Sequence, residues 1–177
     1  RPTIIKEKQA AAAVGQAMLM QIYQNFFNRY NQTVAQVLLT KEELSSDSRY
    51  ENTHNTLMTL LEMGIVPIIN ANDTISTYEI EISDNDRLSA MVAEIVEADL
   101  LILLSDIDGL YTADPHKDPN AILLKKVTAI NEDILKLAGI SSTTQGTGGM
   151  VTKLRAAQIC LSCGCDMVIA NGHDPEN

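Results

Sequence analysis

Apolar residues follow two kinds of pattern along the chain, one with helical spacing and one of short, nearly uninterrupted runs. The helical spacing predicts helices at residues 9–29, 48–63, 86–96, 131–137 and 150–163. The short runs predict strands at residues 33–39, 65–69, 100–104, 122–124 and 166–170. Strands that alternate with helices in this way indicate an α/β fold with a mainly parallel sheet and helices on both faces. We expect residues 1–177 to form a single domain of this kind.

The first predicted helix carries an apolar stripe that we expect to face the core. Its members recur every four residues and are Val14, Met18, Ile22 and Phe26, with Leu19 and Tyr23 beside them. Gly15 lies in the same helix, where a glycine costs about 1 kcal/mol relative to alanine. We expect a close contact with another part of the fold to be the reason for this glycine.

Two further helices and one polar segment complete the predicted layout. We expect the helix at 48–63 to end at Gly64 and to turn three leucines inward, namely Leu57, Leu60 and Leu61. We expect the helix at 86–96 to bury Leu88, Met91, Val92, Ile95 and Val96. Residues 70–83 are polar and partly alternating, which predicts a hairpin or flap outside the sheet.

The net charge of −10 argues against nucleic acid or an anionic membrane as a partner, because both require a basic surface. The three cysteines, Cys160, Cys163 and Cys165, are odd in number, which indicates reduced thiols in a cytoplasmic protein. They do not predict a metal site, because no second Cys or His cluster would complete four ligands. The sequence shows no signal peptide and no apolar run of about 18 residues, so neither secretion nor a membrane span is indicated.

A glycine-rich stretch, residues 146–149, directly precedes the last predicted helix, which carries Lys153 in its first turn. Glycines let the backbone approach a ligand closely, and the N–H groups at a helix N-terminus bind anions. A lysine in the first turn opposes the helix dipole unless an anion lies between it and the helix end. The stretch therefore predicts a phosphate site, although its spacing differs from that of a Walker loop. A flexible loop followed by a solvated lysine is the alternative.

Three of the apolar strands run into polar residues. These residues are Asn70, Asn72 and Asp73, then Ser105, Asp106 and Asp108, and finally Asn171 and Gly172. In open parallel sheets, ligands bind outside the carboxyl ends of the strands. Turn formation explains any single strand end, but the three ends together with the glycine stretch predict a binding crevice.

The run Asp84-Asn85-Asp86 opens the predicted helix at 86–96. Acidic residues and asparagine are favoured at helix N-termini, so capping explains this run without any ligand. Contact with a substrate or with a lysine is the functional alternative.

Four segments together resemble the amino acid kinase family, and within it the members that phosphorylate glutamate. They are residues 65–73, 83–90, 103–115 and 146–153, and the resemblance extends over nearly the whole chain. It implies an αβα-sandwich kinase fold that uses ATP and Mg²⁺. The implied reaction converts L-glutamate to glutamyl 5-phosphate, the first intermediate of proline synthesis. Proline as a feedback inhibitor and a homo-oligomer of two or four subunits are also implied.

Carried over residue by residue, the resemblance implies two catalytic residues and two groups of binding residues. Lys153 would lie on the transferring phosphate, and Asp86 would organise this lysine. Asn70, Asp73 and Asn85 would contact glutamate. The nucleotide site would comprise Ser105, Asp106, Tyr111, Asp114, Gly146, Thr147, Gly148, Gly149, Met150 and Lys153.

The chain departs from the family pattern at its start. Family members begin with a strand, a glycine loop and a lysine that touch the phosphates, and none of these precedes Arg1. We therefore expect a partial kinase domain. If residues 1–177 were the whole polypeptide, half of the groups that hold the phosphates would be missing. Ser105 stands where the family often has threonine, a change that keeps the hydroxyl. The alternatives are a kinase of acetylglutamate, aspartate, carbamate or a nucleotide, and a nucleotide-binding piece without turnover.

Overall fold

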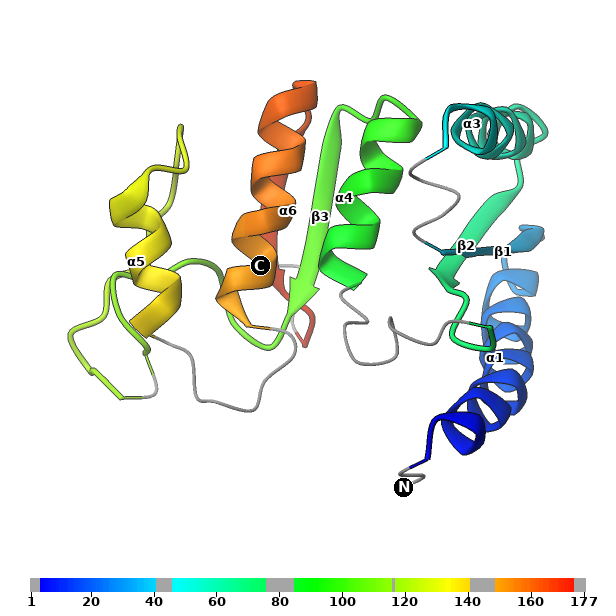
Figure 1. The fold of residues 1–177 in the computed structure, drawn as a ribbon, viewed down its shortest axis with the longest axis horizontal. Coiled ribbons are helices and arrows are strands. Elements are labelled where there is room, and N and C mark those ends of the chain that lie inside the picture. Colours follow the sequence, from blue (N-terminus) through cyan, green and yellow to red (C-terminus); the bar gives the residue numbers. More distant parts are fainter. Residues whose placement is uncertain (1–3, 41–45, 76–84, 116, 141–148, 174–177) are drawn as a thin grey trace. The chain divides into compact units, whose positions relative to one another are not determined.

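The computed structural model describes residues 4–40, 46–75, 85–115, 117–140 and 149–173, which belong to two compact units (Figure 1). Unit 1 is Arg1–Asn85 and unit 2 is Asp86–Asn177. Each unit contains its own pair of parallel strands, with helices packed against it. The prediction of an α/β fold with parallel strands is confirmed, and the single domain stays a prediction.

Unit 1 is built on strands β1 (Val34–Leu39) and β2 (Val66–Ala71), which pair in parallel from Val34 opposite Val66 to Leu39 opposite Ala71. Helices α1 (Ile5–Asn28) and α3 (Asp47–Glu62) lie on opposite faces of this pair (Figure 1). Leu38 lines a hollow against α1, whereas Val37 and Leu39 line a hollow against α3. This alternation follows from the two-residue period of side chains along a strand.

The apolar stripe of α1 is exposed, so the prediction that it faces the core is wrong for the described residues. Val14 is 65% exposed and Met18 is 60% exposed, and Ile22 and Phe26 are each more than half exposed. Ala12 and Gln16, on another side of α1, approach the strands, and Leu19, beside the stripe, lines the hollow between this helix and the strands. Gly15 has no neighbouring atom within 4 Å of the position of an added Cβ, so the expected close contact is also wrong.

Helix α3 begins and ends within a residue of its predicted bounds, and Gly64 follows it with a left-handed φ of 69°. Within α3, Leu57 is fully buried and Leu60 is half-buried. Leu61 is 46% exposed, contrary to the prediction. Asn70 and Ala71 belong to β2 rather than to the predicted flap. Residues 76–84, most of that flap, lie outside the described residues.

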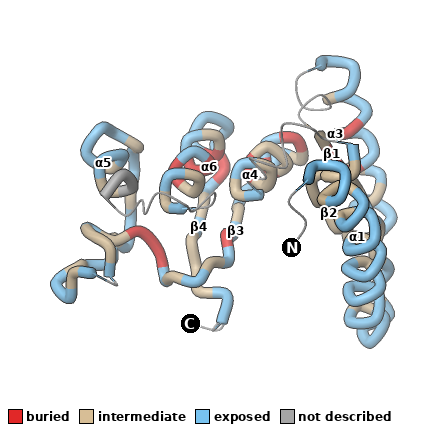
Figure 2. Tube along the Cα trace, turned by 60° about the horizontal axis from the view of Figure 1, so that its bottom comes forward, coloured by how far each residue is buried: buried red, intermediate tan, exposed pale blue. Residues whose placement is uncertain are grey.

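Unit 2 is built on strands β3 (Leu100–Ser105) and β4 (Asp166–Asn171), which are also parallel. Helices α4 (Asn85–Ile95) and α6 (Met150–Cys163) pack on one face of this pair. The core between them consists of small or medium side chains, namely Ala90, Ala93, Leu103, Ala156, Cys160 and Cys165. Figure 2 shows these buried positions gathered where the two helices meet the strands.

Two alanines that were not predicted to be buried join the predicted Ile95 as the buried positions of α4. Ala90, Ala93 and Ile95 are buried, whereas the other residues expected to be buried are half-exposed. Small side chains allow α4 to lie close to the sheet, which keeps the larger ones at the edges of the contact.

The second face of the unit 2 strands is exposed in the described structure. Ile102 is 54% exposed and Leu104 is 61% exposed, and only Leu103 is buried in β3. The expected helices on both faces of the sheet are therefore not seen for these two strands in the described residues, because α4 and α6 both pack on the face of Leu103. Leu161 of α6 is likewise 49% exposed.

Helix α5 (Glu132–Ile140) forms a second, smaller core with the start of α6. Leu110 and Leu154 are its buried centre, and Ile134 and Leu137 of α5 pack against them. The strand predicted at residues 122–124 is reduced to one antiparallel bridge between Tyr111 and Leu123. Among the described residues, no helix is long and apolar enough to cross a membrane.

Candidate functional site

Lys153 occupies the first turn of α6, as predicted, and its side chain is 12% exposed. Its Nζ atom donates a hydrogen bond to Oδ2 of Asp86 over 3.0 Å. The N-terminus of a helix carries partial positive charge and disfavours a lysine, but a neighbouring carboxylate offsets that effect. Asp86, a residue of the same unit, therefore supplies a negative charge beside Lys153.

Thr152 also donates to Asp86, and the sequence reasoning missed this residue. Its Oγ1 atom lies 2.7 Å from Oδ2 of Asp86 and 2.7 Å from the carbonyl oxygen of Gly149. A hydroxyl has a single proton to donate, so these two acceptors compete for it. The signal that could have revealed Thr152 is its position beside Lys153 in the first turn after the glycine stretch.

Gly149 is the N-cap of α6, with an extended backbone and no side-chain capping bond. Its carbonyl oxygen accepts the backbone N–H of Thr152 over 3.1 Å, which closes the first turn. Met150 follows as the first helical residue. The other predicted phosphate-binding positions, Gly146, Thr147 and Gly148, lie outside the described residues.

The carboxyl ends of β3 and β4 lie side by side, as predicted for a crevice in a parallel sheet. Ser105 is opposite Asn171, and the backbone N–H of Gly172 donates to the carbonyl oxygen of Ser105 over 2.7 Å. The Ser105 hydroxyl donates to Oδ1 of Asp106 over 3.1 Å. Two of the predicted nucleotide-binding residues are therefore in direct contact.

Asp108 fixes the loop that follows β3. Its Oδ1 atom accepts a hydrogen bond from Nδ2 of Asn171 over 2.9 Å, and its Oδ2 atom accepts one from the Tyr111 hydroxyl over 3.0 Å. These two donors stabilise the ionised carboxylate and lower the pKa of Asp108. The same carboxylate raises the pKa of Tyr111. Tyr111, a predicted nucleotide-side residue, is thus held by a carboxylate that the sequence reasoning placed only among the strand ends.

Asp114 serves the turn that follows Tyr111. Its Oδ2 atom lies 3.0 Å from Nζ of Lys117, and its carbonyl oxygen accepts the backbone N–H groups of Lys117 and Asp118. These contacts stabilise the turn, and the binding of the nucleotide by Asp114 stays a prediction.

In unit 1, the predicted glutamate-binding residues Asn70 and Asn85 approach each other. Nδ2 of Asn85 lies 3.5 Å from Oδ1 of Asn70, which also accepts the backbone N–H of Ala71 over 2.9 Å. Nδ2 of Asn70 donates to Oε1 of Gln16, a residue of α1, over 3.1 Å. The side-chain amide of Asn70 is therefore held at both of its ends.

Asn70 and Asp73 line one hollow of about 190 Å³ between α1 and the strands. The wall on the α1 side is formed by Ala12, Gly15, Gln16 and Leu19. The Oδ1 atom of Asp73 is shielded from solvent. This hollow combines a polar end at the β2 terminus with an apolar wall, as pockets for small ligands commonly do.

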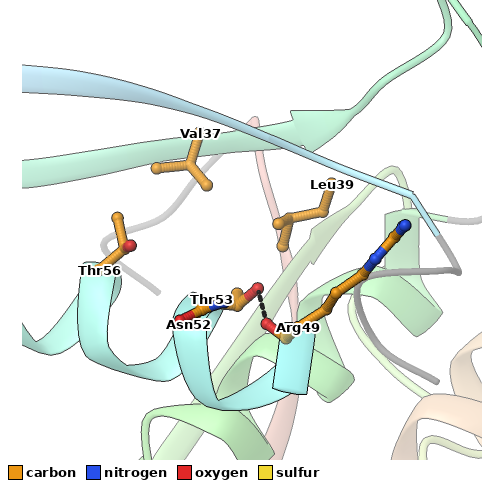
Figure 3. A pocket seen from close by; sticks show the side chains of 6 residues that line it. All are labelled: Val37, Leu39, Arg49, Asn52, Thr53 and Thr56. Atoms are coloured by element: carbon orange, nitrogen blue, oxygen red, sulfur yellow. Dashed lines mark hydrogen bonds between the residues drawn. The ribbon is translucent and has the colours of Figure 1, made fainter. Parts of the chain in front are cut away.

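A second hollow, of about 340 Å³, lies on the opposite face of the unit 1 strands (Figure 3). It is lined by Val37, Leu39, Arg49, Asn52, Thr53 and Thr56. Thr53 donates to the carbonyl oxygen of Arg49 over 2.9 Å, so its hydroxyl serves the helix. The sequence reasoning named none of the four α3 residues, although their spacing places them on one helix face.

The cysteines lie around the end of α6. All three are free thiols, of which Cys160 and Cys165 are buried and Cys163 is exposed. Burial, reinforced by the neighbouring Cys165, raises the pKa of Cys160 to about 12. No group of three or more His, Cys, Asp or Glu side chains in the described part of the chain is placed to hold a metal ion.

A family model described as "Amino acid kinase family" matches residues 2–171. The chain belongs to the amino acid kinase family. The resemblance seen in the sequence is confirmed by this match. The two catalytic residues that this resemblance implies, Lys153 and Asp86, are the ion pair at the start of α6.

Curated relatives within this family carry the name glutamate 5-kinase. One from Thermoanaerobacter sp. is 51% identical over 97% of this chain and 46% of its own length. One from Clostridium acetobutylicum is 52% identical over 99% of this chain and 66% of its own length. The chain thus spans between about half and two thirds of the length of these relatives.

A solved structure of isopentenyl phosphate kinase in complex with its substrate matches 91% of this chain and 60% of that chain. The TM-score is 0.60 and the sequence identity is 23%. At this identity the similarity shows a shared fold alone, and that fold agrees with the α/β architecture of an amino acid kinase.

Proposed function

We propose that the protein transfers the γ-phosphoryl group of ATP to the side-chain carboxylate of L-glutamate. The product is glutamyl 5-phosphate, and the reaction is the first step of proline biosynthesis. The observation that carries this proposal is the identity of about half of all residues, over nearly the whole chain, to relatives named glutamate 5-kinase.

The ion pair at the start of α6 supports a phosphoryl-transfer role for Lys153. Phosphoryl transfer depends mainly on positioning and on the stabilisation of charge, with little covalent participation by the enzyme. The substrate carboxylate is already ionised at neutral pH, so the reaction needs no strong base. Its main obstacle is the approach of two anions, which the ammonium of Lys153 and the N–H groups at the helix N-terminus reduce. Asp86 holds that ammonium in place, with Thr152 beside it.

Asn70, Asp73 and Asn85 bind glutamate in this proposal. Glutamate presents one ammonium group and two carboxylates, so a site for it needs acceptors and donors together. The carboxylate of Asp73 and the amide oxygen of Asn70 are acceptors for the ammonium, and side-chain amide groups are donors for carboxylates. The placement of Asn70 and Asp73 around one hollow supports this assignment.

In this proposal, ATP is held by residues from the end of β3 and the loop after it, and from the glycine stretch and the start of α6. Ser105, Asp106, Tyr111 and Asp114 lie on the nucleotide side, and Gly146, Thr147, Gly148, Gly149 and Met150 surround the phosphates. Mg²⁺ typically keeps several waters and binds through one or two carboxylates and the substrate phosphates. In this proposal Mg²⁺ arrives with ATP and neutralises phosphate charge.

The remaining properties of the proposal follow from the family. They are a cytoplasmic location, assembly into dimers or tetramers, and inhibition by proline. The alternatives are another amino acid kinase, acting on acetylglutamate, aspartate or a nucleotide, and a nucleotide-binding fragment without turnover. The sequence identity to glutamate 5-kinases favours glutamate over these substrates.

Trapping of the acyl phosphate with hydroxylamine tests the proposal. The protein is incubated with ATP, Mg²⁺ and L-glutamate, and we expect hydroxamate to form only when glutamate is present. Hydroxamate formation with acetylglutamate or aspartate in place of glutamate would support the other family members. Stabilisation by Mg-ATP against heat without any phosphate transfer would identify a nucleotide-binding fragment.

A further inference from the structure

We propose that Gln16 is a positioning residue that sets the orientation of the Asn70 side chain toward glutamate. The inference rests on the proposed function, because it assigns Gln16 a role in the binding of that substrate. Gln16 lies on α1, 54 positions before Asn70 in the sequence, and no motif connects the two residues.

Two amide hydrogen bonds in series link Asn70 to the framework of unit 1. Nδ2 of Asn70 donates to Oε1 of Gln16 over 3.1 Å. Nε2 of Gln16 in turn donates to Oε1 of Gln36, on β1, over 3.2 Å. Because Nε2 of Gln16 donates to Gln36 on β1, Oε1 of Gln16 is directed at Asn70.

The direction of these bonds decides which end of the Asn70 amide faces its other neighbours. With Nδ2 on Gln16, Oδ1 accepts from the backbone N–H of Ala71 and faces Nδ2 of Asn85. If the amide turned over, its NH₂ group would face these two donors and its oxygen would face the oxygen of Gln16. Gln16 thus excludes the flipped orientation, in which Asn70 would offer no acceptor on the side of Ala71 and Asn85.

The position of Gln16 explains why this orientation matters for a ligand. Gln16, Asn70 and Asp73 line the same hollow of about 190 Å³. A side chain that must accept from an ammonium and keep its contact with Asn85 needs a single orientation before the substrate arrives. Pre-organisation of this kind increases affinity because binding then does not have to order the side chain.

The test compares three substitutions in the full-length protein. Gln16→Met keeps the length of the side chain and removes both hydrogen bonds. Gln36→Met removes only the second bond, so it acts through Gln16. Gln24→Met is the matched control, because Gln24 is an exposed glutamine on the same helix α1.

Steady-state rates of hydroxamate formation are measured with glutamate and ATP varied separately. We expect Gln16→Met to raise the KM for glutamate about tenfold, the effect of losing one hydrogen bond whose partner is left unsatisfied. Its KM for ATP should change less than about twofold, because Asn70 serves only glutamate. Gln36→Met should raise the KM for glutamate by a smaller factor, about threefold, and Gln24→Met should behave as the wild type.

An unchanged KM for glutamate in Gln16→Met would overturn the inference. Equal increases in the KM values for glutamate and ATP would also overturn it, because they would mean a general structural effect. If Gln16→Met does not fold, Gln36→Met takes its place in the test. A raised KM for glutamate with an unchanged KM for ATP in that variant would support the inference, and an unchanged KM for glutamate would overturn it. A wild-type protein that forms no glutamate-dependent hydroxamate would instead refute the proposed function itself, which separates the two failures.

Discussion

Lys153 and Asp86 are 67 positions apart in the sequence, yet Nζ of the lysine lies 3.0 Å from Oδ2 of the aspartate. Both side chains are mostly buried, with exposed fractions of 12% and 21%. This pair joins the first turn of α6 to the first turn of α4. It places a restrained cation beside the helix N-terminus, as the proposed role of Lys153 in phosphoryl transfer requires.

We expect Lys153→Ala to lower kcat by more than about a hundredfold, the effect of removing one preorganised charge-stabilising group. Lys136→Ala is the matched control, because Lys136 forms an exposed ion pair with Asp133 on α5. That variant should keep the wild-type rate. Steady-state hydroxamate assays on both variants measure the difference, and a rate for Lys153→Ala near that of the wild type would rule out its assigned role.

Thr152→Val replaces a hydroxyl with a methyl group of similar size beside Asp86. We expect kcat to fall about tenfold, because the carboxylate loses one donor and is less well fixed beside Lys153. Thr152→Ser keeps the hydroxyl and should retain most of the activity. The ratio of the two rates measures the contribution of the hydrogen bond, and equal losses in both variants would point to packing of the methyl group instead.

Gly15→Ala should stabilise the protein by about 1 kcal/mol, because alanine is the better helix former. The added methyl group meets no atom within 4 Å in the described structure, so no steric penalty opposes this gain. Thermal or urea unfolding of both proteins measures the change. Destabilisation by this substitution would mean that Gly15 is in close contact after all, as the sequence alone suggested.

The cysteines should react with iodoacetamide in a fixed order. A pKa raised to about 12 keeps the Cys160 thiol protonated at pH 8, and the thiolate is the reactive form. We expect exposed Cys163 to be labelled first, and Cys160 to stay unlabelled even at pH 10 in the folded protein. Peptide mapping by mass spectrometry identifies the labelled residue. Labelling of Cys160 at the rate of the urea-unfolded protein would contradict its burial.

Much of the secondary structure could be predicted from local patterns. The strands at Val34–Leu39 and Asp166–Asn171 and the end of α6 before Gly164 agree with the expected bounds to within a residue or so. These features depend on residues close together in the chain, such as an apolar run or a glycine that accepts the left-handed backbone at a helix end. Burial could be predicted less well, because an apolar stripe shows which side of a helix can be buried but not what packs there.

The sequence by itself determined the α/β fold, the family and the residue types of the candidate site, because periodicity, glycine spacing and short motifs are local. Only the tertiary structure decided which of these residues meet. The pairing of Asp86 with Lys153 and Thr152, and of Gln16 with Asn70, joins segments more than 50 positions apart. Such contacts depend on the path of the chain between the segments, and a hydrogen bond requires atoms to be placed to within a few tenths of an ångström.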